Sequence, residues 1–516
     1  MAPKDAWAAI RAFGLDLSFP TYKQQGTGTA EVPYLELIVL FSFIVFIWEF
    51  YLDLRQYGAL QRKDVPEALT ARIGELDQAA AAKAGGDAKG KGKDGSTTTT
   101  LLDRLTSKFD AARKYSIDKA HLGFVESVFS QAEATAMLML GSMPWFWDLS
   151  VDLAGKWFGK AEDEYIVSLV FLGINMVIEN VVHLPFSLWA VFVVEQRHGF
   201  NKQSLKDFFL DKVKAIILSA LLGGPMTIAV LYVIKAGGPN FFLYLYLLVL
   251  AFQLVLLTIY PTIIAPIFNK YEPLPEDSEL KSQIDALASR VKFPLTKVFV
   301  VDGSRRSAHS NAYFYGFFKN KRIVLFDTLL TQVGFDGERE GGREGEEKNE
   351  HIGAHGYIYI SHSSLPPFLP SFLQVQHSEL LSILAHELGH WAHSHTFQMF
   401  FVSQVHLFLA FFLFSSSLEN ADLFSSFGFA KRPTIIALFL FFQAIWSPVD
   451  KALSFAFTLW TRKNEFQVRA PSPPSHPPSL SSSLPSSFGF ALFLFLLRDL
   501  RPGGRRERTS FAQHPL

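Results

Sequence analysis

The residues best suited to catalysis stand together at 384–391, in the sequence LAHELGHW. His386 and His390 are four residues apart, so on a helix they project from one face and both imidazoles can reach a single zinc ion. Glu387 lies on the adjoining face, where its carboxylate can take a proton from a water that zinc has activated. A solvated helix that carries these side chains by chance is the alternative. The apolar residues on both sides favour an ordered helix and a zinc-peptidase motif.

A catalytic zinc site needs a third protein ligand, and the order of the elements indicates where it lies. Two apolar spans follow His390, and two crossings return the backbone to the side of the membrane that it left. Glu465 is the first isolated carboxylate after the second of these spans. We therefore expect it to complete the site with His386 and His390. Glu419 and Asp422 lie between the two spans and would face the opposite side.

Three other polar side chains, His393, His395 and Asp450, are not expected to bind the metal. A third ligand of the HExxHxxGxxH type is excluded, because position 393 is His393 rather than glycine and position 396 is Thr396. We expect His393 and His395 to lie around the metal or at the surface. Asp450 stands at the edge of a span, where its simplest role is a polar contact between helices.

The composition restricts the chemistry and points to a membrane protein. The 516 residues include no cysteine, so any zinc must be held by His, Asp or Glu, and disulfides and thiol catalysis are excluded. The formal net charge is zero, which gives no bias toward nucleic acid. The 51 phenylalanines and the positive mean hydropathy are unusual for a soluble enzyme. The N-terminus lacks an apolar core with a cleavage site, so we expect no removable signal peptide.

Seven apolar stretches are candidates to cross a bilayer. They lie at Tyr34–Leu52, Phe129–Leu149, Tyr165–Val194, Val213–Ile234, Phe241–Ile264, Met399–Ser416 and Pro433–Leu453. The third contains Glu179, Asn180, His183 and Pro185. Polar groups at that depth normally face a bundle interior or a wet cavity. They could line a functional cavity or form hydrogen bonds between helices, and both interpretations stay open.

Basic residues indicate how the spans are oriented. Lys and Arg gather after the first span, before the second and after the third, whereas the loops after the second and fourth hold mainly Lys156, Lys160 and Lys235. Odd spans are therefore expected to end in the cytosol. The stretch from about Phe268 to Leu381 and the zinc motif would lie on that side.

The chain is expected to divide into six parts. These are an N-terminal segment (1–33), five spans with a flexible loop at 79–100 (34–264), a cytosolic strand-and-helix part (265–332), an atypical insertion (333–377), a zinc-peptidase core with two further spans (378–467) and a divergent Pro/Ser-rich tail (468–516). The predicted fold class is a mainly α polytopic membrane protein with a small α/β cytosolic part.

Several stretches, in the same order along the chain, resemble the CAAX prenyl protease 1 family of integral-membrane zinc peptidases that process farnesylated proteins. They are EQRHGFN at 195–201, FNKY at 268–271, SAHSNAYFYG at 307–316, FFKNKRIVLFDTLL at 317–330, HELGHW at 386–391 and EFQ at 465–467. The likeness covers most of 34–332 and 378–467.

The resemblance implies about seven transmembrane helices around a hydrophobic chamber, in the membrane of the endoplasmic reticulum or the nuclear envelope, with the active site facing the cytosol. It implies one zinc ion per chain, held by His386, His390 and Glu465, with Glu387 as general base. The implied reaction removes the three residues after a prenylated cysteine and, for some substrates, makes a second cut nearer the N-terminus.

The resemblance also implies that Asn311 and Ala312 lie on an edge strand that holds the substrate backbone. This role fits the general way in which an extended peptide adds a strand to an exposed sheet edge. An ordinary buried strand fits the same alternating pattern.

The chain departs from the family after Gln467. The family has Ala-Asp where this chain has Val468-Arg469, and the missing aspartate would stand one turn beyond Glu465, where it could support the site. We interpret 468–516 and 333–375 as candidates for translated intron sequence. A stress-type membrane protease of the same clan is disfavoured, because those proteins have fewer spans before the HExxH motif.

The sequence thus predicts a zinc-dependent membrane endopeptidase that acts on CAAX-type prenylated proteins. The alternative is a catalytically inactive membrane scaffold or lipid-chamber protein, because the end of the family pattern is missing.

Overall fold

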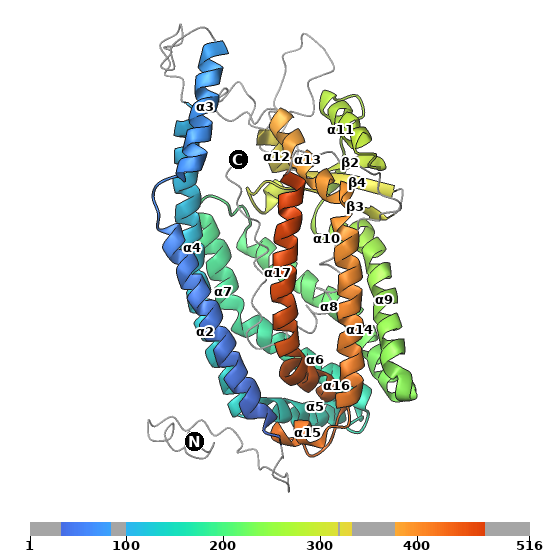
Figure 1. The fold of residues 1–516 in the computed structure, drawn as a ribbon. Coiled ribbons are helices and arrows are strands. Elements are labelled where there is room, and N and C mark those ends of the chain that lie inside the picture. Colours follow the sequence, from blue (N-terminus) through green and yellow to red (C-terminus); the bar gives the residue numbers. More distant parts are fainter. Residues whose placement is uncertain (1–31, 84–99, 318–319, 333–376, 470–516) are drawn as a thin grey trace. The chain divides into compact units, whose positions relative to one another are not determined.

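The computed structural model describes residues 32–83, 100–317, 320–332 and 377–469 (Figure 1). These residues form two compact units. The first holds the described residues before Gly199 together with Ser417–Pro448, and the second holds those of Gly199–Ser416 together with those after Pro448. The expected N-terminal segment, the loop at 79–100, the insertion at 333–377 and the tail at 468–516 lie wholly or mostly outside the described residues.

The first unit is helical. Its helices are α2 (Tyr34–Leu60), α3 (Glu67–Lys83), α4 (Leu101–Met139), α5 (Ser142–Phe158), α6 (Glu164–Val182), α7 (Leu184–Trp189), η1 (Ala190–Glu195), α15 (Ala421–Ser426), α16 (Thr434–Leu440) and η5 (Phe441–Trp446). Helix α4 begins with a capping box. The Asp103 N–H donates to the Thr100 hydroxyl, and the Thr100 N–H donates to the Asp103 carboxylate. Both of these N–H groups would otherwise have no partner within the helix.

The apolar stretch that the sequence predicts as a span at 129–149 is instead divided between α4 and α5. The chain turns at Leu140 and Gly141, and Gly141 has a φ of +64°. Glycine adopts this left-handed conformation without the strain that a Cβ would cause, so it ends one helix and starts the next.

The second unit combines long helices with a small sheet. Its elements are α8 (Leu205–Ala236), η2 (Gly238–Asn240), α9 (Phe241–Ile259), η3 (Tyr260–Ile264), α10 (Ala265–Phe268), β1 (Tyr271–Pro273), α11 (Glu279–Arg290), β2 (Leu295–Val301), η4 (Gly303–Arg305), β3 (Ala312–Phe317), β4 (Asn320–Phe326), α12 (Asp327–Gln332), α13 (His377–Ala392), α14 (His395–Ser417) and α17 (Ser447–Arg469). The strands lie in the order β1-β2-β4-β3. Strands β2 and β4 are parallel, and the other two pairs are antiparallel.

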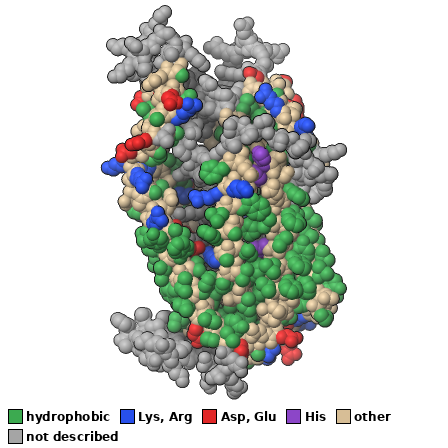
Figure 2. All heavy atoms as spheres, in the orientation of Figure 1, with side chains coloured by type: hydrophobic (Ala, Val, Ile, Leu, Met, Phe, Trp, Pro, Cys, Tyr) green, Lys and Arg blue, Asp and Glu red, His purple; other side chains and the backbone are tan. Residues whose placement is uncertain are grey.

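Six segments of the described chain are long and apolar enough to cross a membrane. They are Tyr34–Leu60, Glu164–Val182, Leu205–Ala236, Gly238–Phe268, His395–Ser417 and Thr434–Val468. Figure 2 shows hydrophobic side chains gathered over the region of α9 and α14. On these two helices, Leu247 is 49% exposed and Phe401 is 62% exposed. A face of this kind suits contact with lipid tails. The predicted fold class, a mainly α polytopic membrane protein with a small α/β part, is confirmed.

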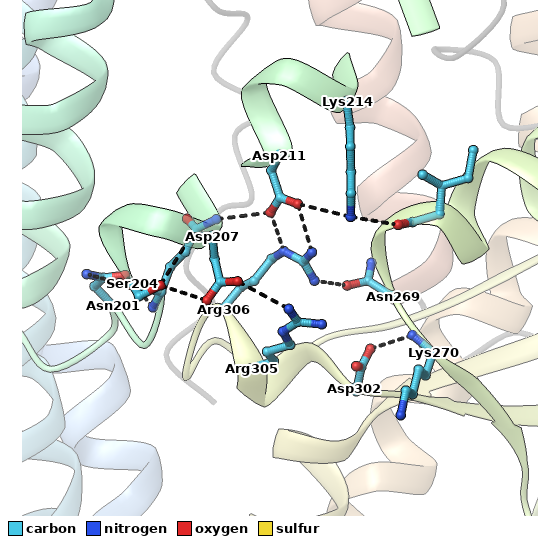
Figure 3. A network of polar contacts seen from close by, with 12 residues as sticks. Asn201, Ser204, Asp207, Asp211, Lys214, Asn269, Lys270, Asp302, Arg305 and Arg306 are labelled. Atoms are coloured by element: carbon cyan, nitrogen blue, oxygen red, sulfur yellow. Dashed lines mark hydrogen bonds and ion pairs between the residues drawn. The ribbon is translucent and has the colours of Figure 1, made fainter. Parts of the chain in front are cut away.

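A network of ion pairs joins the sheet to the start of α8 (Figure 3). The Arg306 guanidinium donates to both carboxylate oxygens of Asp211, at 2.7 and 3.1 Å, and to the Asn269 side-chain oxygen at 2.7 Å. Arg305 donates to Asp207 at 3.2 Å. A guanidinium that bonds a carboxylate through two nitrogens fixes direction as well as distance. The network therefore places the sheet at the α8 N-terminus and gives the FNKY stretch a structural role.

Candidate metal centre

Helix α13 presents its two histidines because another face of the helix is buried. Leu384, Leu388 and Trp391 follow helical spacing and are 2%, 1% and 7% exposed, in the core that includes residues of α11 and the sheet. Each buried leucine contributes about 1.5–3 kcal/mol, which fixes the rotation of α13 about its axis. His386 and His390 lie on a different face, and their side chains stay partly accessible.

Glu465 on α17 meets both histidines. Its Oε2 lies 3.4 Å from His386 Nε2, its Oε1 lies 3.5 Å from His390 Nε2, and the two imidazole nitrogens are 3.3 Å apart. Donor atoms around a tetrahedral zinc ion, with bonds of about 2.0–2.1 Å, are separated by about 3.3–3.4 Å. The three residues therefore fit a zinc ion within a few tenths of an ångström.

Burial sets the protonation of two groups at this site before a metal is bound. Burial, reinforced by the negative charge of Glu465, raises the pKa of Glu387 to about 7. Burial lowers the pKa of His390 to about 4, against the attraction of Glu465. The neutral imidazole is the form that binds a metal. A carboxylate that titrates near neutral pH is suited to accept a proton and return it.

Two successive hydrogen bonds hold the His390 ring through its Nδ1 atom. His390 Nδ1 lies 3.1 Å from Nδ1 of the buried His395, and His395 Nε2 lies 3.1 Å from Gln467 Oε1. Because a carboxamide oxygen can only accept, His395 must carry its proton on Nε2, and its Nδ1 accepts the proton of His390 Nδ1. This leaves the lone pair of His390 on Nε2, the atom that faces Glu465 and His386. The two hydrogen bonds thus select the His390 tautomer with a free Nε2 lone pair, which is the form that can bind a metal.

Gly389 allows α13 and α17 to approach closely at the site. A Cβ on this glycine would lie 2.6 Å from Val468 Cγ1, far inside the normal contact distance. Gly389 directly precedes His390, and Val468 stands one turn beyond Glu465 on α17. The absence of a side chain at 389 therefore sets the distance between the helix that carries the two histidines and the helix that carries Glu465.

Strand β3 lies at the edge of the sheet and contacts α13. Ala312 is its first residue and Asn311 precedes it. The Ala312 N–H donates to the side-chain oxygen of Asn311 at 2.8 Å, and the Asn311 carbonyl accepts from Phe326 N at 3.0 Å. Within the described part of the chain β3 pairs only with β4, so one side of the strand has no strand neighbour. The part of Asn311 and Ala312 in substrate binding stays a prediction.

The remaining candidate residues divide between the site and its surroundings. The His393 ring stacks on that of His395, with centroids 5.4 Å apart. Asp450 Oδ1 lies 3.4 Å from His406 Nε2, a polar contact between α17 and α14 of the expected kind.

The sequence did not single out Gln467 or Gly389 for any role. The EFQ and HELGH stretches contain them, but nothing in either stretch gives their distance from His395 or Val468.

Known proteins resemble this chain over both halves. Residues 56–270 match the family described as CAAX prenyl protease N-terminal, five membrane helices, and residues 275–469 match peptidase family M48. The chain is 38% identical over 437 residues to the CAAX prenyl protease 1 homolog of Mus musculus, covering 84% of each protein. It is 36% identical over 471 residues to that of Arabidopsis thaliana, covering 91% of this chain and 89% of the relative.

A solved structure shares the fold. The crystal structure of S. mikatae Ste24p matches with a TM-score of 0.65 at 30% identity, covering 85% of this chain and 87% of the other. The sequence, the membrane helices and the fold of the chain therefore agree in placing it among the same proteins.

Proposed function

Because this chain belongs to the CAAX prenyl protease 1 family and its second half to peptidase family M48, we propose that it is a zinc-dependent endopeptidase that removes the last three residues of prenylated CAAX proteins. That it is a membrane metallopeptidase follows from the family itself. Our proposal concerns the identity of the metal, its ligands, the substrate and the mechanism.

One observation carries the proposal. Donor atoms of His386, His390 and Glu465 lie 3.3–3.5 Å from one another, although Glu465 comes from a different helix far along the chain. Two imidazoles, one carboxylate and an open position make up a common catalytic zinc site, and the set contains no sulfur that would favour a structural one. This supports zinc as the metal, one ion at this centre, and these three residues as its ligands.

The chemistry divides between the metal and Glu387. When bound, zinc supplies a Lewis acid that polarises a carbonyl group and makes a water molecule a stronger acid. Glu387 stands beside His386 and has a pKa raised by burial. We assign it to accept the proton of the attacking water and to deliver that proton to the amine that leaves. Proton transfer of this kind contributes about 10²–10⁴-fold to a rate.

The position of the site suits a lipid-anchored substrate. His395, which supports His390, is the first residue of α14, a helix apolar enough to span the membrane. The metal centre thus stands at the end of a helix that can span the membrane, a position that suits a substrate anchored in the bilayer. Strand β3 contacts α13 and has one side without a strand neighbour among the described residues, which suits it to align the peptide that follows the prenylated cysteine.

We place the site on the cytosolic side of the endoplasmic reticulum membrane or nuclear envelope. The Arg306–Asp211 pair holds the sheet at the α8 N-terminus, close to the basic residues Lys202 and Lys206. Basic loops mark the cytosolic face of a membrane protein, which supports this orientation.

Release of a tripeptide tests the proposed reaction. The chain, purified in detergent and loaded with zinc, is incubated with a farnesylated CAAX peptide, and the products are identified by mass spectrometry. We expect one tripeptide per substrate and a loss of about 10²–10⁴-fold for Glu387→Gln, which keeps the side-chain shape and removes the base. The same peptide without its prenyl group is the control for substrate class.

The outcomes separate the candidate functions. A zinc-loaded chain that binds the prenylated peptide and does not cleave it would be the inactive scaffold. Cleavage that persists in Glu387→Gln refutes the role of Glu387. Equal cleavage of prenylated and unprenylated peptides refutes the proposed substrate.

A further inference from the structure

A second group of metal-binding side chains lies in the first unit, in and beside the membrane helix α6. Glu133 comes from α4, Glu179 from the last turn of α6, and His183 from the residue that ends α6. His183 Nε2 lies 3.1 Å from Glu133 Oε2 and 3.5 Å from Glu179 Oε1, and all three donor atoms lie within 4.8 Å of one another. We propose that these three residues bind a second divalent cation of the zinc type, separate from the catalytic centre.

The chain positions the three donors in a defined way. Glu179 and His183 are four residues apart at the end of one helix, so they project from one face, with the same spacing as His386 and His390. The His183 ring is flanked by the rings of Phe129 and Phe186, at centroid distances of 6.1 and 6.0 Å. These two aromatic rings restrict the imidazole to an orientation in which its Nε2 faces the carboxylates.

Charge balance favours a divalent ion at this place. Two carboxylates in an apolar helical unit carry two negative charges, and such groups are costly there unless paired. A protonated His183 would contribute one positive charge to this group. A divalent cation would contribute two positive charges, and two carboxylates with one imidazole are a ligand set that zinc and similar ions accept.

The surroundings leave room for the rest of a coordination shell. A cavity of about 70 Å³ is lined by both carboxylate residues and by the amide side chains of Asn175 and Gln443. A water molecule needs about 10–15 Å³ measured in this way, so several fit. Three protein donors and one to three waters give the four to six ligands that a divalent transition metal takes.

Counting zinc in variants of the full chain tests the proposal. After equilibration with zinc and removal of the excess, we expect two zinc ions per wild-type chain. We expect one in His386→Ala/His390→Ala and one in Glu133→Gln. Asn180→Ala is the matched control, because Asn180 lies on the same helix and, among the described residues, its side chain bonds only to the Met176 carbonyl. It should keep both ions.

A titration separates this proposal from the proposed function. In the His386→Ala/His390→Ala background, calorimetry with zinc should detect one remaining site, at least tenfold weaker when Glu133→Gln or Glu179→Gln is added. These glutamines preserve shape and hydrogen bonding, so either variant tests the site if His183→Ala does not fold. Zinc content of one per wild-type chain, unchanged by Glu133→Gln, would mean that the cluster is an ion pair of protonated His183 and would overturn the proposal.

Discussion

Replacing Gly389 by alanine should weaken zinc binding, although alanine is the better helix former. The added Cβ would stand 2.6 Å from Val468 Cγ1, whereas carbon atoms in contact are normally about 3.5–4.0 Å apart. The two helices must therefore separate by about 1 Å near this point. A zinc site tolerates deviations of only about 0.2 Å in its zinc–ligand distances. Glu465 is one turn from Val468, so the separation of the helices moves its carboxylate oxygen too far from the two histidines to share a zinc ion with them.

The expected magnitude comes from the loss of one well-placed ligand. We expect zinc affinity to fall by at least the 10–100-fold that displaced supporting groups typically cost. The free energy of unfolding without zinc should fall by no more than about 2 kcal/mol, because the gain of about 1 kcal/mol from alanine inside a helix offsets part of the about 1–3 kcal/mol cost of the clash. Zinc affinity is measured by competition with a chelator of known affinity, and stability by thermal unfolding in detergent.

Val468→Ala provides the matched rescue. The nearest atom that remains is Val468 Cβ, 3.6 Å from the added group, so Gly389→Ala/Val468→Ala should recover most of the lost affinity. Gly58→Ala is the control, since a Cβ on this helical glycine meets nothing within 4 Å. Unchanged zinc affinity in Gly389→Ala would refute the reasoning, because it would mean that the Val468 side chain turns aside although β-branched residues are stiff at χ1.

Three further predictions concern the support of the site, the sheet and the metal. Gln467→Ala should lower zinc affinity about 10–100-fold by freeing the tautomer of His395, while Gln467→Glu, which still accepts that proton, should largely restore it in chelator competition. Burial lowers the pKa of Lys321 to about 8 from 10.5 in the unfolded chain, so the folded state holds fewer protons between these values and stability should rise with pH across them. Lys321→Met should remove this slope and stabilise the chain at pH 7 by up to about 3 kcal/mol in thermal unfolding; a less stable variant would contradict this. Chelation should abolish cleavage, and restoring zinc to 100 times its Kd should stabilise the chain by about 2.7 kcal/mol, an effect that Glu465→Ala should lose.

The candidate metal ligands and the candidate base could be selected from the sequence because local and topological rules single them out. Helical periodicity alone places His386, Glu387 and His390. Two expected membrane crossings would bring the chain back to the same side, and this expectation selected Glu465 over Glu419. The structure brings the donor atoms of His386, His390 and Glu465 together as this reasoning requires.

The supporting groups could not be predicted because they depend on tertiary packing. His395 and Gln467 are far apart in the sequence, and only the packing of α17 beside α13 and α14 makes them partners. Hydropathy also failed at 129–149, because a window average does not detect that Gly141 takes a left-handed conformation and ends a helix. The polar residues of the third span kept two interpretations open for the same reason. One of them, His183, bonds to Glu133, which lies on another helix.

The location of the metal tests the account most directly. A crystal structure of the zinc-loaded chain, with anomalous difference density recorded at the zinc edge, shows where the ion binds. We predict a peak about 2.0–2.2 Å from His386 Nε2, His390 Nε2 and one oxygen of Glu465, with Glu387 close by and not bonded to the ion. Absence of density between these three residues, or a peak to which Glu465 contributes no oxygen, would contradict the account.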